Sequence, residues 1–345
     1  MAEGEEPPVS YEDLALIEAE FEDVDTEIMR KQYDLSAPLY AKRTEVTRKI
    51  PNFWPLVIEQ APPDIDQWIQ PHDSRIIAES LLNIEVRRPE LDNKGSGNPR
   101  SVSIKLEFKP NQDFEDTVLE KTFWHRRAKD GWSGLVSEPV RVHWKKGKDL
   151  TEGLTDGAVA LWEARKKTGD MTAKTLPEYY ALKKKVDSWN GSNTSFFTWF
   201  GWVSGRRWVS AEESEEANRM YLESKEKRMK AAKSEGDAAE DTNEDEDQEE
   251  ENDDEAVEVH QAGEELAISF AEELWPNALK LFTQAQDDDI SEIDFEDMDT
   301  DEEDEDDDDE PIDIRALVQD KGGKARSRDS TGGGAAPPSK KQKKK

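Results

Sequence analysis

The side chains that could perform catalysis or bind a metal are few in this chain and lie far apart in its sequence. The four histidines are His72, His125, His143 and His260, and no two of them have the spacing of an HExxH metal motif. The 345 residues include no cysteine, which excludes thiol nucleophiles, disulfides and cysteine-ligated metals. No glycine-rich phosphate loop follows a predicted strand. We therefore expect no enzyme activity, no metal site and no cofactor.

Aspartate and glutamate are the residues whose spacing does predict a chemistry. Residues 235–258 contain 15 of them, residues 287–310 contain 18, and neither run contains lysine or arginine. These two runs account for nearly all of the net charge of -34, so the rest of the chain is almost neutral. Two polyanionic segments attached to an ordinary domain predict a basic macromolecular partner.

Calcium binding is an alternative reading of the same acidic runs, because carboxylates bind hard cations. Neither run has the EF-hand spacing with its glycine. The acidic stretch Met1 to Pro8 lacks the apolar region of a secretory signal, so a calcium store is not indicated. No run of about 18 apolar residues occurs, so we expect no membrane partner.

A long amphipathic helix is predicted over residues 11–50. It must end near Ile50, because Pro51 disfavours helical geometry in the preceding residue. Pro38 lies inside this range, so either the helix kinks there or two helices meet. The apolar residues recur every three or four positions and form the predicted dimerisation stripe: Leu14, Ile17, Phe21, Val24, Ile28, Leu35, Leu39 and Val46. A stripe of this length exceeds what a small domain can cover, which favours pairing with a second copy, with an intramolecular helical hairpin as the alternative.

An α+β domain with an antiparallel meander is predicted after this helix. Alternating apolar residues indicate four strands, at 82–86, 102–108, 118–124 and 140–144. No long helix separates them, which favours a meander over a parallel sheet. Helices are predicted at 158–167, 176–186, 212–233 and 264–282. We assign six aromatic residues to the core: Phe53, Trp54, Phe196, Phe197, Trp199 and Trp275.

Four short motifs resemble one protein family. In chain order they are KIPNFW at 49–54, KKGKDLT at 145–151, SFFTWF at 195–200 and ELWPNAL at 273–279. With the terminal acidic run, they are similar to the nucleosome assembly protein family, and more closely to its SET (template-activating factor) branch. The resemblance covers roughly residues 11–150, 195–201 and 264–297. It implies a histone chaperone that forms a headphone-shaped homodimer, with a backbone helix from each chain and an earmuff domain at each end.

The resemblance also implies a division of the chain into functional parts. Histones would bind the acidic underside of the earmuff and the acidic runs, for nucleosome assembly or disassembly. The expected parts are disordered 1–10, backbone helix 11–50, earmuff 51–290 with a helical insertion 151–194 and a charged, acidic insertion 202–258, and a disordered acidic tail with a basic C-terminus at 291–345. The basic end of the predicted third helix could contact DNA, a partner enzyme or the chain's own acidic tail, with a solvated charged helix as the alternative.

Histone-binding candidates are carried over by position from this resemblance. On the folded part they are Thr198, Glu264, Glu265, Glu272 and Glu273. At the start of the segment expected to be flexible they are Asp287, Asp288, Asp289, Glu292 and Asp294. An ordinary solvated acid is the alternative for each. No strong direct nucleic-acid binding is expected.

The basic C-terminus predicts the cellular location. Lys340, Lys341, Lys343, Lys344 and Lys345 follow two prolines and resemble a nuclear import signal, so we expect the nucleus, with shuttling to the cytoplasm left open. A basic tail that folds back on the acidic run is the alternative. Inhibition or assistance of a chromatin-linked enzyme, a phosphatase or an acetyltransferase, is the remaining functional alternative, and it implies a histone-modifying enzyme as a further partner.

Overall fold

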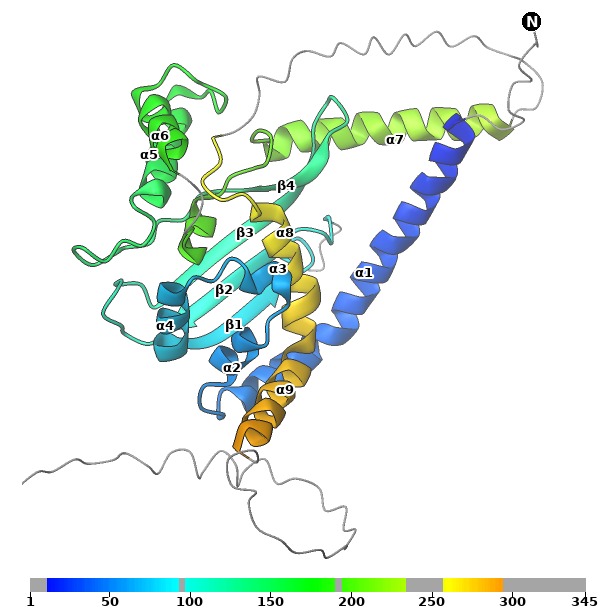
Figure 1. The fold of residues 1–345 in the computed structure, drawn as a ribbon. Coiled ribbons are helices and arrows are strands. Elements are labelled where there is room, and N and C mark those ends of the chain that lie inside the picture. Colours follow the sequence, from blue (N-terminus) through cyan, green and yellow to red (C-terminus); the bar gives the residue numbers. More distant parts are fainter. Residues whose placement is uncertain (1–10, 93–96, 190–193, 234–256, 294–345) are drawn as a thin grey trace, which may run out of the picture. The chain divides into compact units, whose positions relative to one another are not determined.

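The computed structural model describes residues 11–92, 97–189, 194–233 and 257–293 (Figure 1). Helices and a four-stranded sheet alternate in blocks, as expected for an α+β fold. The helices are α1 (Tyr11–Thr47), α2 (Phe53–Glu59), α3 (Pro63–Asp66), α4 (Pro71–Ser80), α5 (Leu154–Thr168), α6 (Pro177–Ser188), the 3₁₀ helix η1 (Phe196–Gly201), α7 (Ala211–Lys233), α8 (Gly263–Ser269), the π-helical turn η2 (Phe270–Leu274) and α9 (Trp275–Ile293). The strands are β1 (Leu81–Arg87), β2 (Val102–Phe108), β3 (Val118–Arg127) and β4 (Ser133–Ser137).

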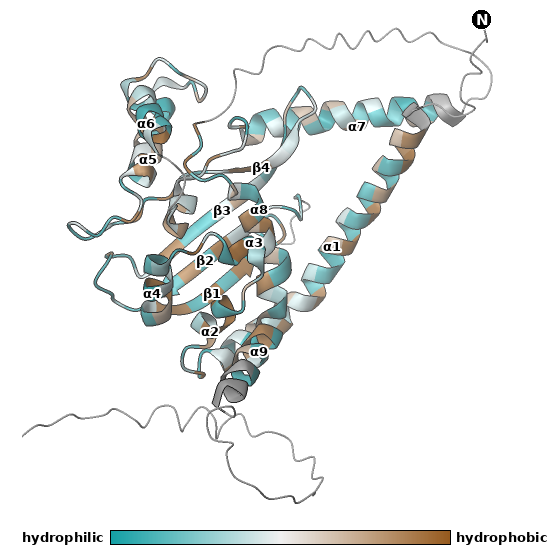
Figure 2. Cartoon of the chain, viewed as in Figure 1, coloured by the Kyte–Doolittle hydropathy of each residue, from teal (hydrophilic) through white to brown (hydrophobic). Residues whose placement is uncertain are grey.

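The sheet is the predicted antiparallel meander, with strand order β1-β2-β3-β4. Leu106 of β2 lies opposite Leu119 of β3, and Phe123 of β3 lies opposite Ser137 of β4. Hydrophobic residues of the central strands face the helices that cover the sheet (Figure 2).

The predicted fourth strand at 140–144 is wrong. This segment forms only an isolated bridge, from Trp144 to Phe114, and the Val140 N–H donates to the Phe200 carbonyl of η1 at 2.7 Å. The strand that completes the sheet is β4, which starts at Ser133. Four of its five residues are buried, so its sequence lacks the alternation that marks a half-exposed strand.

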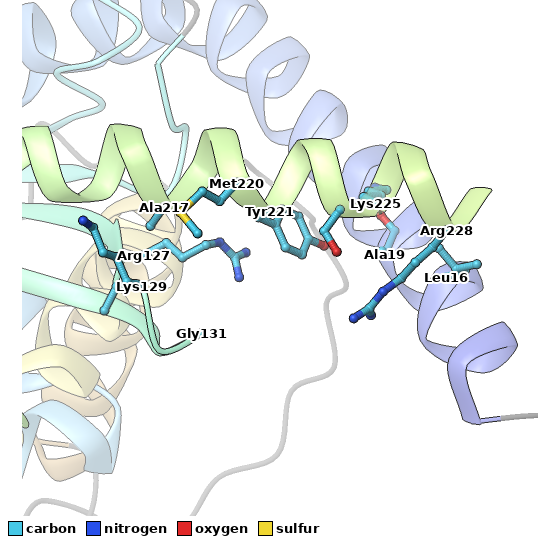
Figure 3. A pocket seen from close by; sticks show the side chains of 12 residues that line it. Leu16, Ala19, Arg127, Lys129, Gly131, Ala217, Met220, Tyr221, Lys225 and Arg228 are labelled. Carbon is cyan, nitrogen blue, oxygen red and sulfur yellow. Dashed lines mark hydrogen bonds between the residues drawn. The ribbon is translucent and has the colours of Figure 1, made fainter. Parts of the chain in front are cut away.

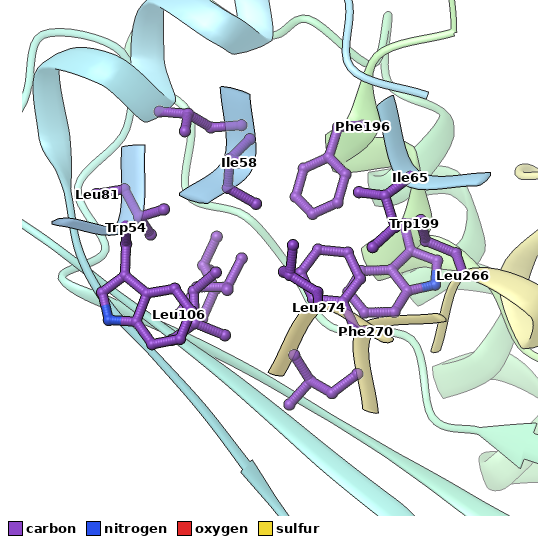
Figure 4. Packing of buried hydrophobic residues seen from close by; sticks show 14 of the residues in the cluster. Trp54, Ile58, Ile65, Leu81, Leu106, Phe196, Trp199, Leu266, Phe270 and Leu274 are labelled. Carbon is purple, nitrogen blue, oxygen red and sulfur yellow. The ribbon is translucent and has the colours of Figure 1, made fainter. Parts of the chain in front are cut away.

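Aromatic residues from three helical segments and from the sheet form the main core (Figure 4). The rings of Trp54 and Trp275 stack at 5.5 Å, and Trp199 stacks on Phe123 at 5.1 Å and on Phe270 at 5.5 Å. All six predicted core aromatics are buried. The polar edges are paired, since the Trp54 indole donates to Asn83 and the Trp199 indole to the Gly263 carbonyl. The core therefore joins α2, η1 and the α8–α9 segment to one face of the sheet.

A buried aspartate and a buried lysine fix η1 in this core. The Asp73 carboxylate accepts hydrogen bonds from the Ser195 hydroxyl at 2.6 Å and from the Phe196 N–H at 2.8 Å. The Lys121 ammonium donates to the carbonyls of Glu138, Phe200 and Trp202, at 2.8 to 3.1 Å. Burial lowers the pKa of Lys121 well below its ordinary value. Loss of either side chain would leave buried polar groups without partners, which is costly.

Helix α1 is continuous through Pro38 and ends at Thr47, three residues before the predicted end. Its 37 residues give a length of about 55 Å. The eight predicted dimerisation residues are all exposed in the single chain, with exposed fractions of 51 to 67%. Figure 2 shows hydrophobic positions recurring along this helix. The described part of the chain therefore leaves the stripe uncovered.

Helices α5, α6 and α7 lie within the regions predicted as insertions, at positions close to those expected. Leu154, Ala158 and Leu161 of α5 pack with Leu182 of α6 and with Val259. Helix α7 begins beside the sheet, where the Ser214 hydroxyl accepts from the Arg127 N–H at 3.0 Å, and then crosses α1. At the crossing, the Lys225 ammonium contacts the Asp23 carboxylate at 2.6 Å and the Ala19 carbonyl at 3.0 Å.

Candidate functional site

The α8–α9 segment carries most of the predicted site residues and contains a π-helical turn at its centre. In η2 the Trp275 N–H donates to the Phe270 carbonyl, five residues earlier. Pro276 follows directly and has no N–H for the carbonyl four residues before it. A wide turn at this position accommodates the proline within a helical segment. The segment therefore presents one continuous buried side to the core and carries its carboxylates on the remaining surface.

Glu264 is partly buried and has a structural bond. Its carboxylate accepts a hydrogen bond from the Leu135 N–H of β4 at 3.0 Å. Burial raises the pKa of the Glu264 carboxyl above its usual range, and the neighbouring Glu265 adds to this, while the Leu135 hydrogen bond opposes it. This carboxylate thus ties α8 to β4, in addition to any contact with a partner.

Glu265, Glu272, Glu273 and Asp287 are exposed. Glu272 has the most defined contact, with the Arg88 guanidinium 3.5 Å from its carboxylate and with 52% of its side chain exposed. Burial lowers the pKa of Arg88, and the adjacent Glu272 opposes this shift. Exposed carboxylates of this kind can attract a cationic partner, and each contributes about 0 to 1 kcal/mol to an ion pair.

A groove of about 700 Å³ lies between α1, the sheet and the α8–α9 segment. Glu264, Ile268 and Glu272 line one side, Asp25 and Ile28 of α1 line another, and residues of all four strands line its floor. Arg87, Arg88 and Arg100 also line the groove, so its charges nearly balance. The groove offers shape and apolar contact, and the excess negative charge lies on the exposed surfaces beside it.

His125 lies in the same groove and is held neutral by its surroundings. Burial, followed by the charges of Arg100 and Arg127, lowers the pKa of His125 to about 4. Its Nδ1 lies 2.9 Å from the Asn98 amide nitrogen, and its Nε2 lies 3.1 Å from the Ser133 hydroxyl. A neutral ring that accepts at Nδ1 and donates at Nε2 satisfies both partners.

Thr198, predicted as a histone-binding residue, is buried and does not belong to an exposed binding surface. It is 2% exposed within η1. Its hydroxyl donates to the Ser195 carbonyl at 2.8 Å. The SFFTWF motif folds as a 3₁₀ turn in which the polar residue completes a local hydrogen bond and the aromatic residues fill the core.

The second group of predicted binding residues lies later in the chain. Asp287, Asp288, Asp289 and Glu292 belong to α9, which continues to Ile293, so the expected flexible segment does not begin at 287. Asp294, the five C-terminal lysines, residues 1–10 and nearly all of the run 235–258 lie outside the described residues.

Sequence reasoning missed the acidic half of α1. Between Glu12 and Glu27 this helix carries eight carboxylates and no lysine or arginine, a signal that the apolar stripe obscured. Glu18, Glu20, Asp25 and Glu27 are exposed. Because Asp25 also lines the groove, α1 contributes negative charge to the side opposite Glu264 and Glu272.

The described residues lack two features that are typical of other classes of protein. They contain no cluster of three histidine, aspartate or glutamate side chains placed to hold a metal ion. None of the helices within these ranges is both long enough and apolar enough to span a membrane.

Comparisons with known proteins agree with the four motifs. A model of the nucleosome assembly protein family matches residues 10–285. A Schizosaccharomyces pombe protein that carries a nucleosome assembly protein name is 38% identical over 152 residues, which cover 41% of this chain and 59% of that relative. Protein SET of Drosophila melanogaster is 27% identical over 177 residues, covering 50% of this chain and 53% of the relative. A crystal structure of Ccp1 is 28% identical, covers 80% of this chain and 95% of that chain, and has a TM-score of 0.46.

The family model spans α1, the complete sheet, η1 and the α8–α9 segment through Ala285. These elements include the groove and the exposed carboxylates beside it. The chain belongs to the nucleosome assembly protein family.

Proposed function

We propose that this protein is a histone chaperone that binds core histones along the groove and the acidic surfaces beside it. The observation that carries the proposal is the position of exposed carboxylates on two sides of one shaped groove, with Asp25 on α1 and Glu272 on the α8–α9 segment. Core histones are rich in lysine and arginine, so they match this distribution of charge. Membership of the nucleosome assembly protein family supports the same partner class.

Charge alone does not supply the required affinity. Exposed ion pairs contribute about 0 to 1 kcal/mol each and are screened by salt. A micromolar complex requires about 8 kcal/mol. Apolar contact in the groove, where Ile268 is exposed, adds a contribution that salt does not screen. The acidic runs 235–258 and 287–310 then act as attractors that raise the association rate.

Dimerisation through α1 and residence in the nucleus belong to the same proposal. Eight exposed apolar residues along one helix support pairing with a second copy. Two chains would place two grooves in one particle. The lysine-rich C-terminus supports import into the nucleus, where core histones act.

Histone binding by full-length protein at physiological salt tests the proposal. We expect micromolar or tighter binding of H2A–H2B, H3–H4 or both, and relief of histone aggregation on DNA. A groove variant that combines Ile268→Ser with Glu272→Gln should weaken binding more than a matched pair, Leu82→Ser with Glu79→Gln, at exposed positions outside the groove. Absence of histone binding by the folded wild-type protein would refute the proposal, and equal effects of the two variants would remove the groove from it.

A further inference from the structure

A second cavity, of about 220 Å³, lies under α7 and differs from the groove in its charge (Figure 3). We call it the basic pocket. Its lining residues come from α7, from the β3–β4 turn and from α1. They include four cations, Arg127, Lys129, Lys225 and Arg228, and no carboxylate. In a chain with a net charge of -34, such a surface indicates an anionic occupant.

Two of the four cations have no counterion among the described residues. Lys225 pairs with Asp23 at 2.6 Å, and Lys129 pairs with Glu216 at 2.6 Å. Arg127 stacks on the Tyr221 ring at 4.1 Å, and its Nε donates to Asn218 at 3.3 Å, but no carboxylate among the described residues pairs with it. Arg228 is exposed and forms no ion pair within the same part of the chain. Figure 3 shows Arg127 and Arg228 beneath α7, with Tyr221 between them.

The acidic run 235–258 has its two ends fixed at opposite ends of α7. It begins two residues after Lys233, the last residue of this helix. It returns to Val257, which lines a small cavity together with Trp208, three residues before α7 begins. Helix α7 has 23 residues and is about 34 Å long. The two ends are therefore separated by about the length of α7, and a run of this length can reach about 80 Å when extended.

We propose that the basic pocket binds the acidic run 235–258 of the same chain. The run has fifteen carboxylates and no cation, which matches two guanidinium groups that have no counterion in the described part of the chain. Arginine holds carboxylates through paired N–H groups, which gives such a contact geometric definition. The tether makes the encounter intramolecular, so its effective concentration is in the millimolar range and weak individual contacts suffice. The inference does not depend on histone binding.

Distance measurement between two spin labels tests the proposal in the full-length protein. Because the chain lacks cysteine, Leu222→Cys on the exposed face of α7 and Asn243→Cys within the run give two unique labels. We expect a short and narrow distance distribution at low ionic strength, which broadens and lengthens at high ionic strength. The double substitution Arg127→Gln and Arg228→Gln should produce the same broadening at low ionic strength. Lys167→Gln with Lys184→Gln, exposed cations on α5 and α6, removes the same charge and should leave the distribution unchanged.

Arg228→Glu serves as a second variant, because Arg228 is exposed, whereas Arg127 stacks on Tyr221. It should broaden the distribution as well. The proposal is overturned if wild-type protein, the pocket variants and the control pair give the same distribution. It is also overturned if a short DNA duplex binds with an affinity that depends on Arg127 and Arg228 while the label distance is insensitive to both, since the pocket would then be a nucleic-acid site.

Discussion

Helix α1 and the α8–α9 segment place their apolar residues in opposite environments. The stripe on α1 is exposed along its whole length, with Phe21 at 67% exposure. The corresponding residues of α8–α9, such as Phe270 at 1%, are buried against the sheet and η1. Both helical segments border the same groove. The apolar residues of α8–α9 thus stabilise the fold of a single chain, and the stripe on α1 remains available for a second chain.

The comparison shows that an apolar pattern does not by itself identify its partner. A stripe at helical spacing indicates that a helix buries one face, but not against what. For α1, the length of the stripe relative to the domain indicates a partner outside the chain, because one chain leaves all of the stripe exposed. For α8–α9, ring contacts with residues far away in the sequence show that the partner is the chain's own core.

A matched pair of phenylalanine substitutions gives the strongest test of this difference between α1 and the α8–α9 segment. Phe270→Ala should lower the free energy of unfolding by about 3 to 5 kcal/mol, because it leaves a cavity next to Trp199. Phe21→Ala should change it by less than about 0.5 kcal/mol at protein concentrations where the chain is monomeric. Urea unfolding followed by tryptophan fluorescence measures both. Similar losses for the two variants would show that α1 packs on its own chain.

Charge introduced into the α1 stripe should dissociate the dimer. Phe21→Glu with Val24→Glu would bury carboxylates in an apolar interface, so we expect the dissociation constant to rise roughly 100-fold, which is about 3 kcal/mol. Light scattering would then change from a two-chain to a one-chain mass, with the circular dichroism of the domain unchanged. The control is Glu18→Gln with Glu20→Gln, at exposed acidic positions of the same helix outside the stripe. A one-chain mass for the wild-type protein at micromolar concentration would refute dimerisation.

Acid should destabilise the groove between the two helical segments through His125. The pKa of His125 is about 4 in the folded chain and about 6.5 when unfolded, so the unfolded state binds more protons in between. The contribution of this histidine is therefore fully present above pH 6.5 and is lost as the pH falls toward 4. The loss amounts to about 3 kcal/mol.

Unfolding free energies measured from pH 7 to 4.5 test this linkage. His125→Gln should flatten the pH dependence, whereas His72→Gln, at an exposed position, should leave it unchanged. Part of the slope should remain in His125→Gln, because burial followed by the charge of Lys121 lowers the pKa of His260 to about 3. An unchanged slope in His125→Gln would contradict the assignment.

The smallest expected effect concerns the exposed carboxylates of the α8–α9 segment. Glu265→Gln and Glu273→Gln should each weaken histone binding by about two- to fivefold, as expected for exposed ion pairs. Neither should change the free energy of unfolding. Glu59→Gln, at another exposed acid, is the control. Binding titrations at two salt concentrations would show whether the effect is electrostatic, because screening should reduce it.

Much of the fold follows from the sequence alone, because its signals are local. The α1 stripe, the first three strands and the aromatic core were predicted and are confirmed. Strand β4 was not predicted, because it is covered on both faces and its sequence does not alternate. The segment at 140–144 has alternating apolar residues and was predicted as a strand, but its Val140 N–H pairs with η1. The burial of Thr198 could not be predicted, because only the tertiary structure shows that its motif is internal. The groove and the basic pocket could not be predicted, since their walls come from segments distant in the chain.

The π-helical turn in η2 has a consequence for which changes of length this part of the chain can accept. Leu266, Phe270, Leu274, Ala278 and Phe282 are buried at strict intervals of four residues. On a regular α-helix each such interval would advance the side chain by about 40° around the axis. One widened turn resets this phase and keeps the row of residues on the core side. Removing a single residue here would rotate one half of the row away from the core. This segment should therefore accept substitutions far more readily than it accepts deletions.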